Sequence, residues 1–132
     1  MSNATVEIKA ADFKDRVEKP GILFLDFWAS WCGPCRSFAP VFEAAADKHP
    51  DVVFGKVNTE EQQELAAAFG IRSIPTIMVF RDSVLLFQQP GALPGEVLEE
   101  LIGKVQALDM VAVKMEIEKA MPEQQGQPAE QA

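Results

Sequence analysis

The segment from Ile22 to Cys35 restricts the fold of this chain more than any other part of its sequence. It begins with Ile22–Trp28 (ILFLDFW), a nearly continuous apolar and aromatic run that is typical of a strand covered on both faces. A turn follows, which ends in Cys32-Gly33-Pro34-Cys35, and apolar residues then recur at helical spacing as far as Lys48. We therefore expect a central strand, a turn that carries the cysteine pair, and a helix.

The rest of the chain alternates between strand and helix patterns. Further strands are predicted at Val6–Ile8, Val52–Asn58, Thr76–Phe80 and Val84–Gln88, and further helices at Ala11–Val17, at Glu61–Phe69 and from Pro94 onward. The last strand should pair back through a polar turn as a hairpin, which gives a parallel sheet an antiparallel edge. We expect an α/β fold with a central mixed sheet of about five strands, flanked by about four helices.

The chain changes character after Leu108. Residues 1–108 have the length and composition of one domain, and 109–132 form a C-terminal extension. Val111–Met121 keeps a helical periodicity, whereas Pro122–Ala132 is rich in Gln, Glu, Pro and Ala and is predicted to be disordered. The extension can be interpreted as a docking segment for partners or as a frayed, solubilising tail.

The charge balance argues against two classes of partner. Twenty acidic and twelve basic residues give a formal charge of −8, which repels nucleic acid and anionic membrane surfaces. The sequence contains no run of 18 apolar residues and does not begin like a secretory signal. We expect a soluble, cytoplasmic monomer with no nucleic-acid or membrane partner.

The cysteine pair is the candidate catalytic centre. An ordinary thiol, with a pKa of about 8.5, is mostly protonated at neutral pH, so a nucleophilic cysteine needs help to become a thiolate. The N-terminus of the predicted helix offers Cys32 unpaired N–H groups and the positive end of the helix dipole. Cys35 lies about one turn further, in position to attack a mixed disulfide, and Pro34 stiffens the small ring. The pair can cycle between dithiol and disulfide without a cofactor.

Asp26 is a carboxylate at a position where the pattern predicts burial. A buried charge is costly unless it is paired or neutralised. Asp26 could accept the proton that leaves Cys35, or it could be a structural carboxylate paired with Lys56 on the neighbouring strand. Both interpretations can hold together, with Lys56 tuning Asp26.

A metal site is not expected. Structural zinc usually takes four Cys or His ligands, and this chain offers two cysteines and a single histidine, His49. Two cysteines also exclude the disulfide-stapled scaffold of many small secreted proteins.

The motif from Trp31 to Cys35 (WCGPC), preceded by FLDFWAS and followed by a helix with an internal proline, closely resembles the thioredoxin family. Lys56, the segment 70–76 (GIRSIPT) and Gly91-Ala92 match the family in order, so the resemblance covers roughly residues 5–108. It implies the thioredoxin fold and the activity of a protein-disulfide reductase that acts on disulfides in client proteins.

The resemblance also implies roles for single residues and a partner. Pro75 matches a cis-proline beside the redox pair, and Trp31, Ile74 and Gly91 match an apolar rim on which substrate peptides lie. The Gly33-Pro34 dipeptide is similar to that of reducing members, whereas oxidases and isomerases typically carry a histidine there. The resemblance also implies that an NADPH-dependent thioredoxin reductase recharges the pair, and this chain itself has no dinucleotide-binding fingerprint.

Three features depart from the family pattern. The hairpin turn is Asp82-Ser83 where a glycine is common, the strand end Asn58-Thr59-Glu60 lacks the usual Asp, and the tail extends past Leu108. Two other functions remain open at this point. One is a binding module whose redox pair is incidental, and the other is an oxidase or isomerase, which would need an oxidising compartment.

Overall fold

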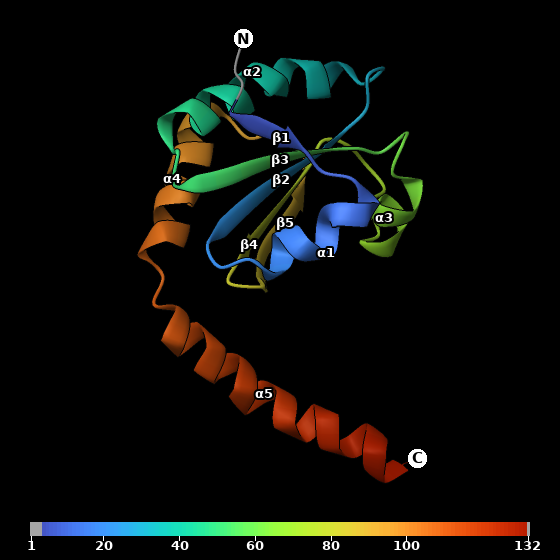
Figure 1. Ribbon diagram of the computed structural model, residues 1–132, viewed down its shortest axis with the longest axis vertical. Helices are drawn as coiled ribbons and strands as arrows, with labels where there is room; N and C mark the ends of the chain where they lie inside the picture. Colours follow the sequence, from blue (N-terminus) through green and yellow to red (C-terminus); the bar gives the residue numbers. More distant parts are fainter. Residues whose placement is uncertain (1–3, 132) are drawn as a thin grey trace.

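The computed structural model describes the backbone of residues 4–131 and the side chains of residues 4–120. One five-stranded sheet, in the order β1-β3-β2-β4-β5, runs through the domain with β2 at its centre (Figure 1). Its strands are β1 (Thr5–Glu7), β2 (Ile22–Trp28), β3 (Val52–Asn58), β4 (Thr76–Arg81) and β5 (Val84–Pro90). The helices are α1 (Ala10–Glu18), α2 (Gly33–Lys48), α3 (Gln63–Ala68), α4 (Gly95–Ala107) and α5 (Met110–Gln131).

Antiparallel pairing begins one strand earlier than the sequence predicted. Strands β1, β3 and β2 are parallel, but β4 pairs antiparallel with β2, and β5 pairs antiparallel with β4. Strand β4 begins at the same edge of the sheet where β3 ends, because Asn58 pairs with Trp28 and Thr76 with Phe27. Helix α3 and the loop after it therefore return the chain to that edge and do not carry it back along the sheet.

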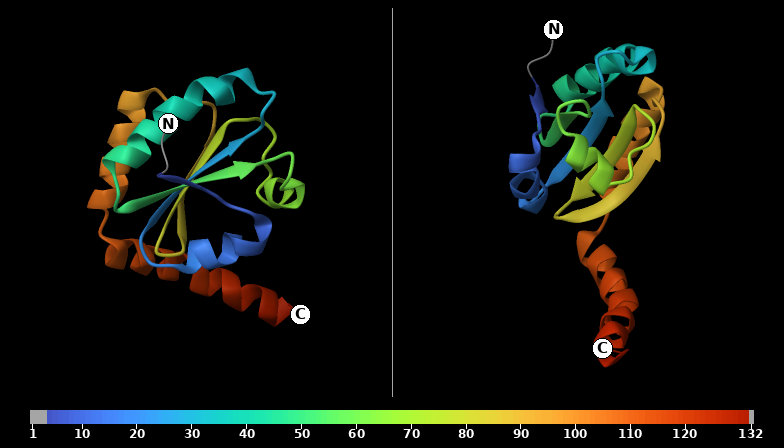
Figure 2. Two further views of the ribbon diagram at one scale, coloured as in Figure 1. Left: turned by 45° about the horizontal axis from the view of Figure 1, so that its top comes forward. Right: turned by 90° about the vertical axis from the view of Figure 1, so that its right-hand side faces the viewer.

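Helices cover both faces of the sheet, and β2 contributes side chains alternately to two cores (Figure 2). Phe24 packs with residues of α2 and α4 such as Phe42 and Ile102. Leu25 points to the other face, which α1 and α3 cover and where Leu65 packs. Because both faces are covered, the apolar run predicted to be the central strand is buried along nearly its whole length.

The hairpin turn between β4 and β5 explains one departure from the family pattern. Asp82 and Ser83 both have positive φ, 52° and 72°, which is the backbone of a two-residue type I′ turn. Aspartate tolerates this conformation better than most residues. Its carboxylate also accepts a 2.8 Å hydrogen bond from the backbone N–H of Gly21, so the turn is tied to the start of β2.

Helix α5 extends away from the sheet, and the four helices expected beside the sheet are α1 to α4 (Figure 1). Asp109 caps α5 by accepting hydrogen bonds from the N–H groups of Val111 (3.0 Å) and Ala112 (3.2 Å). The backbone of α5 is helical to Gln131, beyond Pro122 where the sequence predicted the helix to end, and Ala132 lies outside the described residues.

Candidate active site

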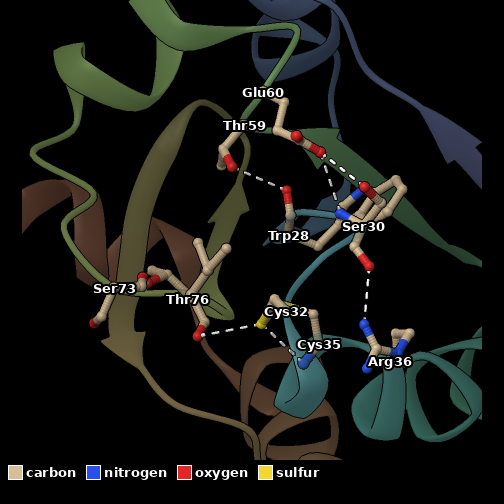
Figure 3. The surroundings of a disulfide bond; sticks show 10 residues. Trp28, Ser30, Cys32, Cys35, Arg36, Thr59, Glu60, Ser73 and Thr76 are labelled. Atoms are coloured by element: carbon tan, nitrogen blue, oxygen red, sulfur yellow. Dashed lines mark hydrogen bonds between the residues drawn. A yellow bond between two sulfur atoms is a disulfide. The ribbon is translucent and has the colours of Figure 1, made fainter.

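The two cysteines lie where β2 ends and α2 begins. Cys32 is the N-cap residue of α2, and Cys35 belongs to its first turn. The two form a disulfide with a Cα–Cα distance of 5.2 Å, and the backbone N–H of Cys35 donates to Cys32 Sγ at 3.1 Å (Figure 3). Both are almost fully buried in this oxidised form, 5% exposed for Cys32 and 3% for Cys35. The N–H group of Cys35 and the helix terminus both favour negative charge on Cys32 Sγ.

The loop before β4 also lies beside the cysteine pair. The Ile74–Pro75 peptide bond is cis, as the family resemblance implied. The carbonyl oxygen of Ile74 lies 3.7 Å from Cys32 Sγ, close enough to accept from the Cys32 thiol in the reduced protein. Gly91, with φ of 100°, donates its N–H to the Pro75 carbonyl at 2.7 Å. Ile74, Pro75 and Gly91 therefore stand together beside the redox pair.

The two tryptophans near the cysteines have different environments. The side chain of Trp31 is 67% exposed at the tip of the turn before Cys32. Trp28 is half-buried and packs against the cluster formed by Ala29 and the two cysteines. Trp31 is thus the large apolar side chain that a partner can reach, whereas Trp28 supports the site from within.

Asp26 is completely buried in β2, on the face that α2 and α4 cover. Among the described residues, neither of its carboxylate oxygens has a hydrogen-bond partner. Burial raises the pKa of Asp26 to about 7, and the nearby charge of Lys56 opposes part of that rise. A carboxyl group with this pKa can take up or release a proton near neutral pH.

Lys56 is placed as the sequence suggested. It is the register partner of Asp26 in the parallel pairing of β2 and β3. Its ammonium group lies 5.0 Å from the centre of the Trp28 ring, within the range of a cation–π contact. Lys56 therefore pairs in register with the residue that carries the buried carboxyl group and contacts the tryptophan that supports the cysteine pair.

A group of polar residues around Ser30 was not singled out from the sequence. Glu60 accepts from the backbone N–H and the hydroxyl of Ser30, and Arg36 donates to the Ser30 carbonyl (Figure 3). The carboxyl ends of the parallel strands β2 and β3 meet at one edge of the sheet, which places the residues after Trp28 beside those after Asn58. That adjacency is the sequence signal that could have identified the group.

No group of three or more His, Cys, Asp or Glu side chains in the part of the chain that the structure describes is arranged to hold a metal ion. Within the same residues, none of the helices is both long enough and apolar enough to cross a membrane.

A Cys-x-x-Cys disulfide at the tip of a long helix, directly after the central strand of a mixed sheet and opposite a cis-proline, defines a thiol–disulfide oxidoreductase. Comparison with known proteins identifies the family. The thioredoxin family model matches residues 4–104, and the chain belongs to the thioredoxin family. The resemblance seen in the sequence, the fold and the oxidoreductase function are thereby confirmed.

Relatives and solved structures agree with this assignment. The chain is 52% identical over 124 residues to putative thioredoxin 2 of Streptomyces coelicolor, covering 94% of this chain and 90% of the relative. It is 40% identical over 103 residues to the thioredoxin of Alicyclobacillus acidocaldarius, covering 77% and 98%. Its fold matches a mutant thioredoxin from Halobacterium salinarum with a TM-score of 0.73 and 29% identity, over 82% and 96% of the two chains. A match of 124 residues is longer than the segment before α5, so the aligned region includes part of the sequence of that helix.

Proposed function

We propose that this thioredoxin works as a reductase of protein disulfides, with Cys32 as the attacking residue and Cys35 as the resolving residue. The observation that carries the proposal is the position of Cys32 Sγ at the N-terminus of α2, where the Cys35 N–H donates to it. The same N–H can stabilise a Cys32 thiolate and orient it toward an incoming disulfide.

The reaction proceeds in two exchanges. The Cys32 thiolate attacks one sulfur of a client disulfide, which forms a mixed disulfide and releases the first client thiolate. Cys35 then loses its proton and attacks Cys32 Sγ, which restores the Cys32–Cys35 disulfide and releases the second client thiolate. The client gains two electrons and the protein loses two, so the pair must be reduced again before the next cycle.

Asp26 is proposed to accept the proton from Cys35 in the second exchange. Asp26 lies on the sheet face below α2, and its pKa of about 7 allows it to be deprotonated in part of the molecules at neutral pH. Lys56 holds that pKa from rising further, which keeps the carboxylate form available. Asp26 would thus act as an acid/base group and Lys56 as a residue that tunes its pKa, and neither would form a bond to the client.

The surface beside the disulfide supports a peptide client. Trp31, Ile74, Pro75 and Gly91 border Cys32, and Trp31 is the most exposed large apolar side chain among them. Gly33 and Pro34 place no ionisable group between the cysteines, which supports reduction as the favoured direction, because a cation there would stabilise the thiolate and make the disulfide more oxidising.

We further propose that an NADPH-dependent thioredoxin reductase supplies the electrons, and that the protein is a cytoplasmic monomer. A domain of residues 1–108 would carry the whole reaction, because every side chain named above lies within it. Helix α5 would then serve a purpose other than the chemistry.

Reduction of insulin by dithiothreitol tests this function. The wild-type protein should accelerate the precipitation of insulin B chains strongly, and both Cys32→Ser and Cys35→Ser should lose most of that acceleration. Asp15→Asn, a change at an exposed carboxylate on α1, is the matched control and should act like the wild type. An inactive wild-type protein would overturn the proposal in favour of a binding module.

A further inference from the structure

The backbone N–H, the hydroxyl and the carbonyl oxygen of Ser30 each have a hydrogen-bond partner. Its backbone N–H and its hydroxyl both donate to Glu60 Oε1, at 3.3 and 2.9 Å. Its carbonyl oxygen accepts from Arg36 Nη1 at 2.9 Å. Figure 3 shows these three contacts converging on Ser30 from the two sides of the turn. The residue that precedes the exposed Trp31 is therefore fixed, although Ser30 itself is exposed to solvent.

The two residues that contact Ser30, Glu60 and Arg36, lie in segments that have further hydrogen bonds of their own. Glu60 lies in the β3–α3 loop, where its N–H donates to Asn58 Oδ1 at 2.9 Å and its carbonyl accepts from Gln63 at 3.1 Å. The neighbouring Thr59 donates both its N–H and its hydroxyl to the Trp28 carbonyl, at 2.9 and 3.1 Å. The Glu60 side chain thus reaches Ser30 from a loop that is already tied to the end of β2.

Arg36 approaches from the opposite side. It lies on α2 directly after Cys35, and its own N–H donates to the Cys32 carbonyl at 3.1 Å. The guanidinium group then reaches back over the turn to Ser30. The Glu60 carboxylate and the Arg36 guanidinium therefore both contact Ser30, and the exposed Trp31 follows Ser30 directly in the chain.

We propose that Glu60 and Arg36 are positioning residues that hold the Ser30–Trp31 segment in the conformation in which Trp31 meets a protein client. A turn that is ordered before binding does not have to be ordered by the client, so less of the contact energy is spent on conformational entropy. The proposal rests on the role of Trp31 in client binding. It assigns neither Glu60 nor Arg36 to the sulfur chemistry.

This division predicts a difference between large and small substrates. A protein disulfide contacts Trp31 and the rim around the cysteines, so loosening the turn should raise KM for insulin. A small aromatic disulfide such as 5,5′-dithiobis(2-nitrobenzoate) has little surface to place on Trp31, so its reduction by the Cys32 thiolate should be almost unchanged. A merely structural role for Glu60 would affect both substrates or neither.

Steady-state kinetics of Glu60→Ala, Glu60→Gln and the wild type with both disulfides test the proposal, together with hydrogen exchange of the Ser30 amide. Glu60→Ala should raise KM for insulin about fivefold, the factor expected from a lost side-chain hydrogen bond, with kcat within about twofold. Glu60→Gln keeps a carbonyl oxygen that can accept from Ser30 and should restore KM. Glu61→Ala removes a neighbouring exposed carboxylate from the same loop and should have no effect.

The outcomes separate this proposal from the proposed function. A wild type that fails to reduce insulin overturns the reductase itself. A wild type that reduces insulin, with an unchanged KM and unchanged Ser30 amide exchange in Glu60→Ala, overturns the positioning role alone. Equal losses with both disulfides would assign Glu60 to the stability of the whole site and also contradict the proposal.

Discussion

Asp26 and Lys56 are register partners on the parallel strands β2 and β3, and both lie on the face of the sheet that α2 covers. The carboxyl group is fully buried, whereas the ammonium group reaches the ring of Trp28. Burial raises the pKa of Asp26 to about 7, with Lys56 opposing the rise. The pair thus keeps a titrating group inside the core, close to neutral pH.

The first prediction concerns stability and pH. In the unfolded chain Asp26 has a pKa near 3.8, so between pH 4 and pH 7 the unfolded state loses a proton that the folded state keeps. The contribution of Asp26 to stability is therefore highest below pH 4 and falls as pH rises toward 7, by on the order of 4 kcal/mol at the limit. The stability of Asp26→Asn should not decrease in this way, so the variant should be more stable than the wild type at pH 8.

Urea unfolding of the oxidised proteins at pH 4 and pH 8 measures the effect. The two curves should lie close together at pH 4 and separate at pH 8, while the exposed Asp15→Asn control follows the wild type at both values. Equal stability of Asp26→Asn and wild type at pH 8 would show that Asp26 is not a strained buried carboxylate.

The second prediction compares two glycines. A Cβ added at Gly55 would lie 2.6 Å from Ile8 Cγ1 and 3.0 Å from Leu25 Cδ2, whereas one added at Gly103 on α4 meets nothing within 4 Å. Gly55→Ala should therefore destabilise the fold by about 1–3 kcal/mol through overpacking. Gly103→Ala should stabilise it by about 0.5–1 kcal/mol, because alanine loses less entropy in a helix. Denaturant midpoints decide the matter, and a stable Gly55→Ala variant would contradict the packing of β1 on β3.

The third prediction separates the two tryptophans. Trp31→Ala removes an exposed side chain, so the free energy of unfolding should change by less than about 0.5 kcal/mol, while KM for insulin rises about tenfold. Trp28→Ala removes packing from the cysteine cluster and should destabilise the fold by about 3 kcal/mol. Thermal unfolding and insulin kinetics on both variants check the contrast. A large stability loss in Trp31→Ala would place that ring in the core instead of on the client surface.

The fourth prediction concerns the extension. Of the residues of α5 whose side chains the structure describes, Met110 alone is buried, and Arg81 joins β4 to the end of α4 by donating to the carbonyls of Val105 and Leu108. A chain that ends at residue 108 keeps these contacts. It should reduce insulin at the wild-type rate and lose no more than about 2 kcal/mol of stability, the contribution of one buried methionine side chain that the truncation removes. Loss of activity in the truncated chain would place part of the reaction machinery in α5.

Much of the fold and of the redox site could be predicted from local sequence signals. The uninterrupted apolar run of β2 indicated its central place, and the cysteine spacing after it indicated a helix-tip nucleophile. The adjacency of Asp26 and Lys56 followed from two neighbouring strand patterns, and the register of β2 and β3 confirmed it. Each of these depends on residues close in sequence or on one strand pairing.

The features that sequence reasoning missed depend on connections between elements. The direction of β4 depends on how the segment between β3 and β4 brings the chain back to the sheet, and no periodicity within Thr76–Phe80 reports on that. The hydrogen bond between the side chains of Ser30 and Glu60 joins two loops whose residues are thirty positions apart in the sequence. Helix α5 has bounds that run past Pro122, whereas the prediction there rested on composition, because a segment rich in Gln, Glu, Pro and Ala is typical of disorder.

The central claim, that Cys32 attacks and Cys35 resolves, is tested most directly by trapping the mixed disulfide. Cys35→Ser, incubated in its reduced form with a disulfide-containing protein, should accumulate a covalent adduct at Cys32, because the second exchange cannot occur. Mass spectrometry of the adduct identifies the linked residue, with Cys32→Ser as the control that should form little adduct. Accumulation of the adduct on Cys32→Ser, or its absence from Cys35→Ser, would contradict the assignment of the two cysteines.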